Sequence, residues 1–148
     1  MIQTITFDRQ NKPSLEEKTQ IINFLHTHLE EYGDPCNQIA KAIDFSLEEY
    51  PSFGGFIVVL RDGHNNDIKG AVVINRTGMQ EYIPENILVY IAIHRDYRGK
   101  GLGASLMNYA ITIAKGAIAL HVEPHNPAKK LYERLGFTNK YLEMRLQK

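Results

Sequence analysis

The sequence predicts an α/β fold with a mixed central sheet of six to seven strands and about four flanking helices. Two patterns predict this class: short runs rich in β-branched residues alternate with longer amphipathic stretches, and a glycine-rich loop joins one of those runs to such a stretch. The length of 148 residues and the hydrophobic content of 43% are sufficient for one domain with a substantial core. We therefore expect residues 1–148 to form a single domain.

The N-terminal third predicts one strand followed by two helices. Residues 2–7 alternate apolar and polar side chains, as a half-buried strand does. Ser14 and Glu17 have the spacing of a capping box, so a helix begins there, and Gly33 is a stop signal. Asp34 and Pro35 are typical of the N-cap and first turn of a second helix. The expected apolar faces are Leu15, Ile22, Leu25 and Leu29 for the first helix, and Ile39, Ile43, Leu47 and Tyr50 for the second.

The remaining two thirds predict a hairpin, a central strand and two strand–helix units. The β-rich runs 56–60 and 68–74 are separated by a polar link suited to a hairpin. Residues 87–93 are almost wholly apolar, which indicates a strand buried on both faces in the middle of a sheet. The later elements are helix 102–115, strand 117–122, helix 127–135 and a final strand near 141–146. The element order is βααβββαβαβ.

Composition excludes several classes of protein. No apolar run approaches the roughly 20 residues of a membrane span, and the N-terminus does not have the pattern of a signal peptide, so we expect a cytoplasmic protein without membrane contact. The net charge of zero and the absence of a basic aromatic stripe disfavour nucleic-acid binding. Cys36 is the only cysteine, which excludes an internal disulfide and a cysteine metal cage. We expect no metal, and a small, half-buried Cys36 near a helix start.

The two parts of the chain differ in charge. Residues 1–93 contain 7 Lys and Arg against 13 Asp and Glu, and residues 94–148 contain 10 against 4. Such a division can place an anionic ligand on one side of a cleft and a cationic one on the other. It has this meaning only if the two parts also face different ligands in space.

The segment 94–104 is the candidate anion-binding loop, because it brings three glycines and three cations to the start of a helix. A flexible basic turn is the alternative. Gly99, Gly101 and Ala104 also fit a dinucleotide fingerprint, with Glu123 as the acid that would bind a ribose. However, five residues separate Ile93 from Gly99, and too little chain follows Glu123 for a doubly wound sheet. A nucleotide-binding oxidoreductase is therefore the weaker interpretation.

Two motifs resemble those of the GNAT superfamily of acyl-CoA-dependent N-acetyltransferases. Residues 98–103, Arg-Gly-Lys-Gly-Leu-Gly, resemble its Arg/Gln-x-x-Gly-x-Gly/Ala signature, and residues 120–137 resemble its second motif, Asn…Ala-x-x-Leu-Tyr-Glu-Lys-x-Gly-Phe. The resemblance covers residues 87–137. It implies a GNAT-like fold, acetyl-CoA as cosubstrate, and direct transfer of an acetyl group to a primary amine of a small molecule or peptide.

The resemblance also implies how coenzyme A would be held. Backbone amides of the loop would bind the pyrophosphate, and the residues concerned are Arg98, Gly99, Lys100, Gly101, Leu102 and Gly103. Backbone groups of Ile91, Ala92 and Ile93 would pair with the pantetheine arm where their strand splays from the next one. An N–H near Ile93 would polarise the thioester carbonyl. His125 or Asn126 would contact the pantetheine region, although Asn126 lies one residue closer to Tyr132 than is usual.

Tyr132 matches the tyrosine that protonates the departing thiolate in the family, and a core tyrosine is the alternative. The general base is less defined. The family's glutamate position holds Ile87 here, so the candidates are Glu85, which lies two residues earlier, His121 on the next strand, and a chain of water molecules.

The acceptor would enter beside the first two helices and the 75–86 loop. Seven acids in this part of the sequence favour a cationic acceptor: Glu30, Glu31, Asp34, Glu48, Glu49, Glu81 and Glu85. A solvated acidic helix face is the alternative explanation for most of them, and the sequence does not identify the acceptor. A non-catalytic acyl-CoA-binding module is the second interpretation of the same loop. The sequence agrees with a monomer and with a homodimer.

Overall fold

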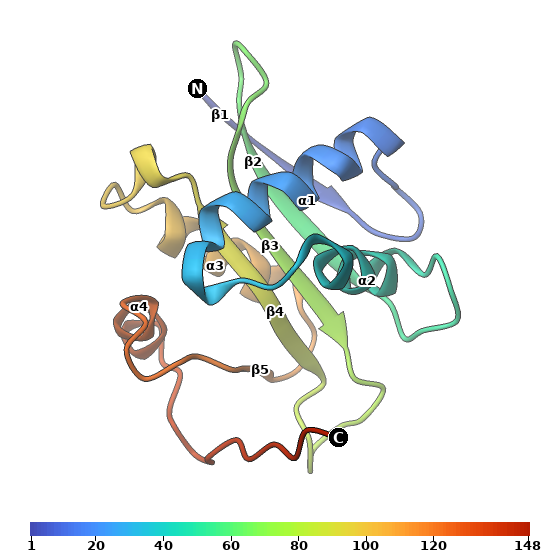
Figure 1. Ribbon diagram of the computed structural model, residues 1–148, viewed down its shortest axis with the longest axis vertical. Coiled ribbons are helices and arrows are strands. Elements are labelled where there is room, and N and C mark those ends of the chain that lie inside the picture. The colour runs from blue at the N-terminus through green and yellow to red at the C-terminus, as the bar shows by residue number, and fades with distance from the viewer.

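The computed structural model describes residues 1–148 and contains one mixed sheet of five strands in the order β1-β2-β3-β4-β5 (Figure 1). The strands are β1 (Ile2–Phe7), β2 (Gly55–Asp62), β3 (Ile68–Arg76), β4 (Asn86–Ile93) and β5 (Ile118–Leu120). The pairs from β1 to β4 are antiparallel, and β4 pairs with β5 in parallel. The predicted mixed sheet is therefore confirmed, and so is the predicted order of elements along the chain as far as the last helix, βααβββαβα.

Two helices cover each face of the sheet. The helices are α1 (Leu15–Leu29), α2 (Cys36–Leu47), α3 (Leu102–Ile113) and α4 (Ala128–Arg134), with short 3-10 turns at η1 (Glu30–Tyr32) and η2 (Arg95–Tyr97). Side chains of α1 and α2 form one core with the sheet, and those of α3 and α4 form a second core on the opposite face. In Figure 1, α1 and α2 cross in front of the strands. No helix is long and apolar enough to traverse a lipid bilayer.

Helix α1 begins as predicted, but its buried face is rotated. The Ser14 hydroxyl accepts a hydrogen bond from Glu17 N (3.1 Å), and the Glu17 carboxylate accepts one from Ser14 N (2.9 Å). The buried residues are Ile21, Phe24 and Leu25, whereas Leu15 is 80% exposed. The expectation that Leu15 belongs to the apolar face is wrong, because the true face is centred on Phe24 and leaves the first turn to solvent.

Helix α2 begins one residue later than predicted. Pro35 is its N-cap and half-buried Cys36 is its first residue, as expected for a small side chain near a helix start. Asp34 does not cap the helix. Its carboxylate instead accepts a 2.5 Å hydrogen bond from the Tyr90 hydroxyl on β4. The partner of Asp34 is therefore distant in sequence, and local capping rules could not identify it.

A one-residue bulge bends β4 where it parts from β5. The register with β3 shifts from Val73↔Tyr90 to Ile74↔Leu88, which leaves Val89 as the extra residue. Leu88 is also the last residue of β4 that pairs with β5. Residues 89–93 therefore continue without a neighbour on that side, and the strand alternates buried and half-buried residues instead of being buried throughout.

The predicted final strand is absent. Residues 141–146 form no strand, so the sheet has five strands and not six or seven. The large side chains of this segment are exposed, namely Tyr141, Leu142, Met144 and Leu146. The physical reason is that β5 has only three residues, which offer few ladder positions to an outer strand, and alternation alone does not form a strand without a partner.

Candidate active site

The loop before α3 presents a row of free backbone donors. Gly99 and Gly101 have φ values of 76° and 81°, which glycine adopts without steric cost. No atom of the chain lies within 4 Å of the position that a Cβ would occupy at either residue. The backbone N–H groups from Arg98 to Ala104 donate no hydrogen bond, and the first bond of the helix start is Ser105 N to Gly101 O. These donors lie at the positive end of the α3 dipole, so they form a cradle for an anion.

Gly103 has a different role from the other two glycines. A Cβ at this position would lie 3.2 Å from Leu131 Cδ2 on α4. Glycine therefore allows α3 to pack closely against α4, which is the helix that carries Tyr132. The third glycine of the motif thus allows the helix that carries the candidate acid to pack close to the cradle.

The open edge of β4 lies beside the cradle. His94 N donates to Lys69 O on β3 (2.8 Å), and antiparallel alternation then directs the backbone of Ala92 toward β3 and that of Ile91 and Ile93 away from it. Ile91 therefore offers its N–H and carbonyl on the side that β5 has left. Ile93 offers its N–H there, because its carbonyl accepts a hydrogen bond from Arg98 Nε (3.1 Å). Of the three residues expected to pair with pantetheine, Ala92 is turned toward β3 and into the α1/α2 core.

Tyr132 is buried in the α3/α4 core and is 7% exposed. Its ring packs edge-to-face against Phe137 with centroids 6.0 Å apart, and its hydroxyl makes no hydrogen bond within the chain. Burial raises the pKa of Tyr132 to about 12, so the phenol keeps its proton at neutral pH. The hydroxyl is not among the buried side-chain polar atoms that lack a partner, so it reaches the surface of this core, where a ligand can contact it.

The two side-chain base candidates lie in different settings. Glu85 precedes β4, at the end of the strand opposite the cradle, and its carboxylate accepts a hydrogen bond from Ala117 N (3.0 Å). That bond lowers the pKa of Glu85, which weakens it as a base. The same carboxyl group covers Gly116, so Glu85 holds the turn that begins β5. His121 follows β5, is 64% exposed, and has Nδ1 3.9 Å from the Glu143 carboxylate.

His125 and Asn126 lie between β5 and α4. The Asn126 side-chain oxygen accepts from Ala128 N (2.9 Å) at the start of α4, and the His125 carbonyl accepts from the Tyr32 hydroxyl (3.4 Å). A hollow of about 360 Å³ lies at this corner. Its lining is Pro124, His125, Asn126, Pro127, Lys129, Lys130 and Glu133. The structure thus places the two expected pantetheine contacts in a hollow that also contains two lysines.

A histidine pair lies where α1 meets the loop, and no sequence pattern predicted it. The His28 and His94 rings stack with centroids 4.2 Å apart, and His28 Nδ1 accepts a hydrogen bond from Arg95 N (3.2 Å). Burial, His94, Arg98 and Arg95 all lower the pKa of His28, and Glu30 partly opposes them. His28 is therefore neutral at pH 7, as its acceptor role requires.

We expect the fold to lose stability as the pH falls below about 6.5, because unfolded His28 binds a proton more readily than folded His28. Urea unfolding at pH 7.5, 6.5 and 5.5 measures this change. His28→Asn keeps an acceptor for Arg95 N without titrating, so it should flatten the dependence. His64→Asn, in an exposed hairpin turn, is the matched control and should not. Equal slopes for all three proteins would contradict the assignment.

Most of the seven acids expected to attract a cationic acceptor have partners in the chain. Glu30 pairs with Arg95 and Arg98, Glu48 with Arg9, Glu49 with Lys12, and Glu85 with the Ala117 amide. Glu31 and Asp34 have no cationic partner and lie between α1 and α2, near Tyr32, and Glu81 lies in the β3–β4 loop. The free acidic groups near the cradle are thus fewer than the sequence indicated.

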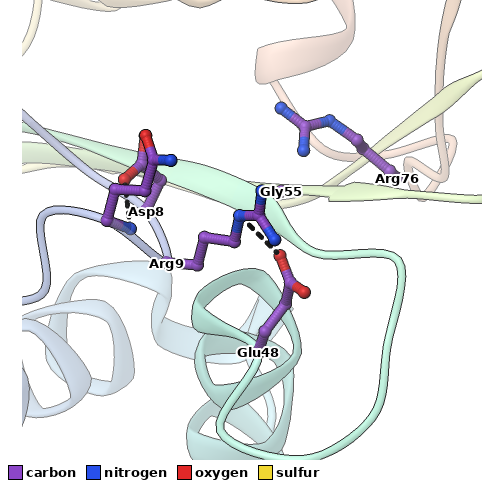
Figure 2. Close-up of a pocket in the computed structure, with 6 residues that line it drawn as sticks. Asp8, Arg9, Glu48, Gly55 and Arg76 are labelled. Atoms are coloured by element: carbon purple, nitrogen blue, oxygen red, sulfur yellow. Dashed lines mark hydrogen bonds and ion pairs between the residues drawn. The ribbon is translucent and has the colours of Figure 1, made fainter.

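A second hollow, of about 200 Å³, lies at the opposite end of the sheet (Figure 2). No hydrophobic residue lines it, and the lining residues are Asp8, Arg9, Gln10, Glu48, Gly55 and Arg76. Figure 2 shows Arg9 directed at Glu48, and the distance from Arg9 Nε to Glu48 Oε2 is 3.7 Å. Gly55 starts β2 and pairs with the end of β3, whereas the cradle adjoins the start of β3. This hollow is therefore separate from the candidate active site.

The model of the family described as Acetyltransferase (GNAT) domain matches residues 52–139, more than half of the chain. The chain belongs to the GNAT acetyltransferase family. The matched residues include β4, the cradle, α3 and α4, so the GNAT resemblance of the sequence is confirmed. The GNAT family implies acyl transfer, with an acyl-CoA donor and an acceptor as substrates.

Individual proteins agree with this assignment. A segment of 53 residues is 45% identical to mycothiol acetyltransferase from Corynebacterium aurimucosum, and covers 32% of this chain but only 17% of that protein. A protein from Pyrococcus horikoshii is 20% identical, with a TM-score of 0.73 over 97% of this chain and 93% of that chain. A GNAT-family acetyltransferase from Streptococcus pneumoniae is 17% identical, with a TM-score of 0.69 over 100% and 98%. Both structures share the fold of this chain, and the Streptococcus pneumoniae protein is described as a member of the GNAT family.

Proposed function

We propose that this GNAT protein transfers an acetyl group from acetyl-CoA to a primary amine by direct transfer. The observation that carries the proposal is the row of free N–H groups from Arg98 to Ala104 beside the open edge of β4. A pyrophosphate needs several converging donors, and a pantetheine arm with amide groups needs an unpaired strand edge. The chain has both features, because the loop that carries the free donors directly follows the open edge of β4.

Different residues bind the cosubstrate, stabilise the oxyanion and transfer protons. The loop amides bind the pyrophosphate, while Ile91 and Ile93 pair with the pantetheine arm and the His125–Asn126 corner contacts it. In this mechanism the N–H of Ile93 stabilises negative charge on the thioester oxygen when the amine attacks. Tyr132, with its proton retained by burial, donates that proton to the departing thiolate. Because Glu85 is held by Ala117 N, the amine proton leaves through His121 or water.

The acceptor approaches on the α1/α2 side, where Glu31 and Asp34 have no cationic partner, and these two acids favour a cationic amine. If these two acids attract the amine through charge, the acceptor KM should rise with ionic strength, because the Debye screening length falls to about 8 Å at 0.15 M salt. Steady-state assays at 0.02 to 0.5 M salt measure this effect, with a neutral amine as the control. A flat response, or a best substrate that is neutral or anionic, contradicts cation selection while leaving acetyl transfer intact.

Release of coenzyme A from acetyl-CoA, measured across amines, peptides and aminoglycosides, tests the proposal. We expect release that depends on both acetyl-CoA and an amine. Tight binding of acetyl-CoA with no release for any amine would indicate the non-catalytic acyl-CoA-binding module. Binding of NAD in place of coenzyme A would indicate the oxidoreductase alternative.

A further inference from the structure

The Arg98 side chain is directed away from the cradle that its own backbone helps to form. Its Nε donates to the Ile93 carbonyl (3.1 Å), one Nη donates to the His28 carbonyl (2.6 Å), and the other pairs with the Glu30 carboxylate (3.4 Å). These acceptors belong to β4, α1 and η1. One guanidinium therefore joins the end of the open strand to the end of the first helix.

The chemistry of these contacts suits arginine and not a simple positive charge. His28 lies in the last turn of α1, whose final carbonyls have no partner within the helix and carry the negative end of its dipole. A planar guanidinium can donate to several acceptors at fixed angles, whereas a lysine ammonium is a point charge. Arg95 pairs with the other Glu30 oxygen (3.1 Å), so the junction holds Glu30 from two sides.

Beyond this junction, the chain from Glu30 to Pro35 forms a connector between α1 and α2. The connector is held at its far end by Asp34, which accepts from Tyr90 on β4, and at its middle by Tyr32, which donates to the His125 carbonyl. It therefore extends from the end of β4 to the β5–α4 corner. One of these segments follows β4 and the other follows β5, and these are the two strands that part after Leu88.

We propose that Arg98 is a positioning residue that couples the acyl-CoA cradle to the connector, and that it does not bind the phosphates through its side chain. The inference rests on the proposed function, because it names the acceptor-side segment that responds when the cradle is occupied. Binding at the loop amides orders the backbone of Arg98. The hydrogen bonds of its side chain to His28 and Glu30 then become more persistent, which reduces the motion of the connector that carries Glu31 and Asp34.

Amide hydrogen exchange of the full chain, with and without coenzyme A, tests the coupling. In the wild type, coenzyme A should protect residues 94–104 and also residues 28–34. In Arg98→Met, coenzyme A should still protect the loop with a Kd within about threefold of wild type, because the backbone donors remain. The connector should exchange about tenfold faster without ligand, because charge-assisted hydrogen bonds are lost, and it should gain no protection from coenzyme A.

Two variants separate positioning from charge. Arg98→Lys keeps the charge but not the fork, so it should behave like Arg98→Met in the connector and, with the best amine found, raise the acceptor KM about tenfold with less effect on kcat. Lys100→Met removes the same charge from the same loop, but the Lys100 ammonium lies 5.2 Å from the Tyr97 ring centroid and forms no ion pair with Glu30. It should leave connector exchange unchanged.

Three results would overturn the inference. The first is connector exchange in Arg98→Met that equals the wild type. The second is a Kd for coenzyme A that rises tenfold or more in Arg98→Met and is restored in Arg98→Lys, and the third is the same connector change in Lys100→Met. If the wild type does not bind coenzyme A, the proposed function fails. The exchange of the ligand-free connector still decides whether Arg98 holds it.

Discussion

Replacing Tyr132 with phenylalanine should lower kcat by roughly 100-fold while the affinity for acetyl-CoA stays nearly the same. General acid catalysis is typically worth about 10²–10⁴ in rate, and a thiol with a pKa near 8.5 is already a tolerable leaving group, so the lower end applies. The ring and its packing against Phe137 remain in Tyr132→Phe. Because the hydroxyl makes no hydrogen bond to the chain and is not buried without a partner, the variant should be about as stable as the wild type.

Steady-state kcat and KM for the best acceptor, measured across pH 6–9.5, provide the test. With a pKa of about 12, Tyr132 stays protonated over this whole range, so it should produce no alkaline fall in the wild-type rate. Tyr109→Phe is the control, because it removes a hydroxyl from a 42% exposed side chain on neighbouring α3. A kcat for Tyr132→Phe within about threefold of wild type would assign Tyr132 to the core alone, provided that chemistry limits turnover.

Gly101→Glu should abolish most of the binding of coenzyme A. The substituent would extend into the open space at the cradle, where it places a negative charge against the site of the pyrophosphate. Loss of about two charge-assisted hydrogen bonds costs about 3 kcal/mol, which corresponds to at least about 100-fold in Kd. Calorimetric titration measures the affinity, and circular dichroism shows whether the fold is intact.

Two controls separate blocking from backbone strain. Gly101→Ala imposes the same positive φ without the charge, so it should lose much less affinity than Gly101→Glu. Gly136→Glu introduces the same side chain at a glycine with φ of 100° and open space, but after α4 and outside the cradle. It should bind coenzyme A normally. Unchanged affinity in a folded Gly101→Glu protein would remove the loop from the binding site.

The elements that depend on local signals could be predicted from the sequence. The capping box at Ser14, the hairpin between β2 and β3, and the glycine-rich start of α3 each have their determinants within a few residues. The candidate cradle is of the same kind, because Gly99 and Gly101 determine its backbone locally. The two GNAT motifs, one in this loop and one at the last helix, together predicted the family of the chain.

The remaining features depend on contacts between distant parts of the chain. The bulge at Val89 follows from the register between β3 and β4, which alternation of apolar residues does not reveal. Glu85 is held by Ala117 across 32 positions, and Arg98 reaches Glu30 and His28 across about 70. The expected strand near 141–146 had the correct alternation, but alternation alone does not provide a partner strand.

The most direct test of the central claim, that the free amides from Arg98 to Ala104 bind the pyrophosphate of coenzyme A, is a titration of ¹⁵N-labelled protein followed through its backbone amide resonances. With coenzyme A, the amides of residues 98–104 should show the largest shifts, together with those of Ile91 and Ile93, and pantetheine alone should shift only the latter two. Saturable binding that leaves the 98–104 amides unmoved, with the largest shifts elsewhere, would contradict the account.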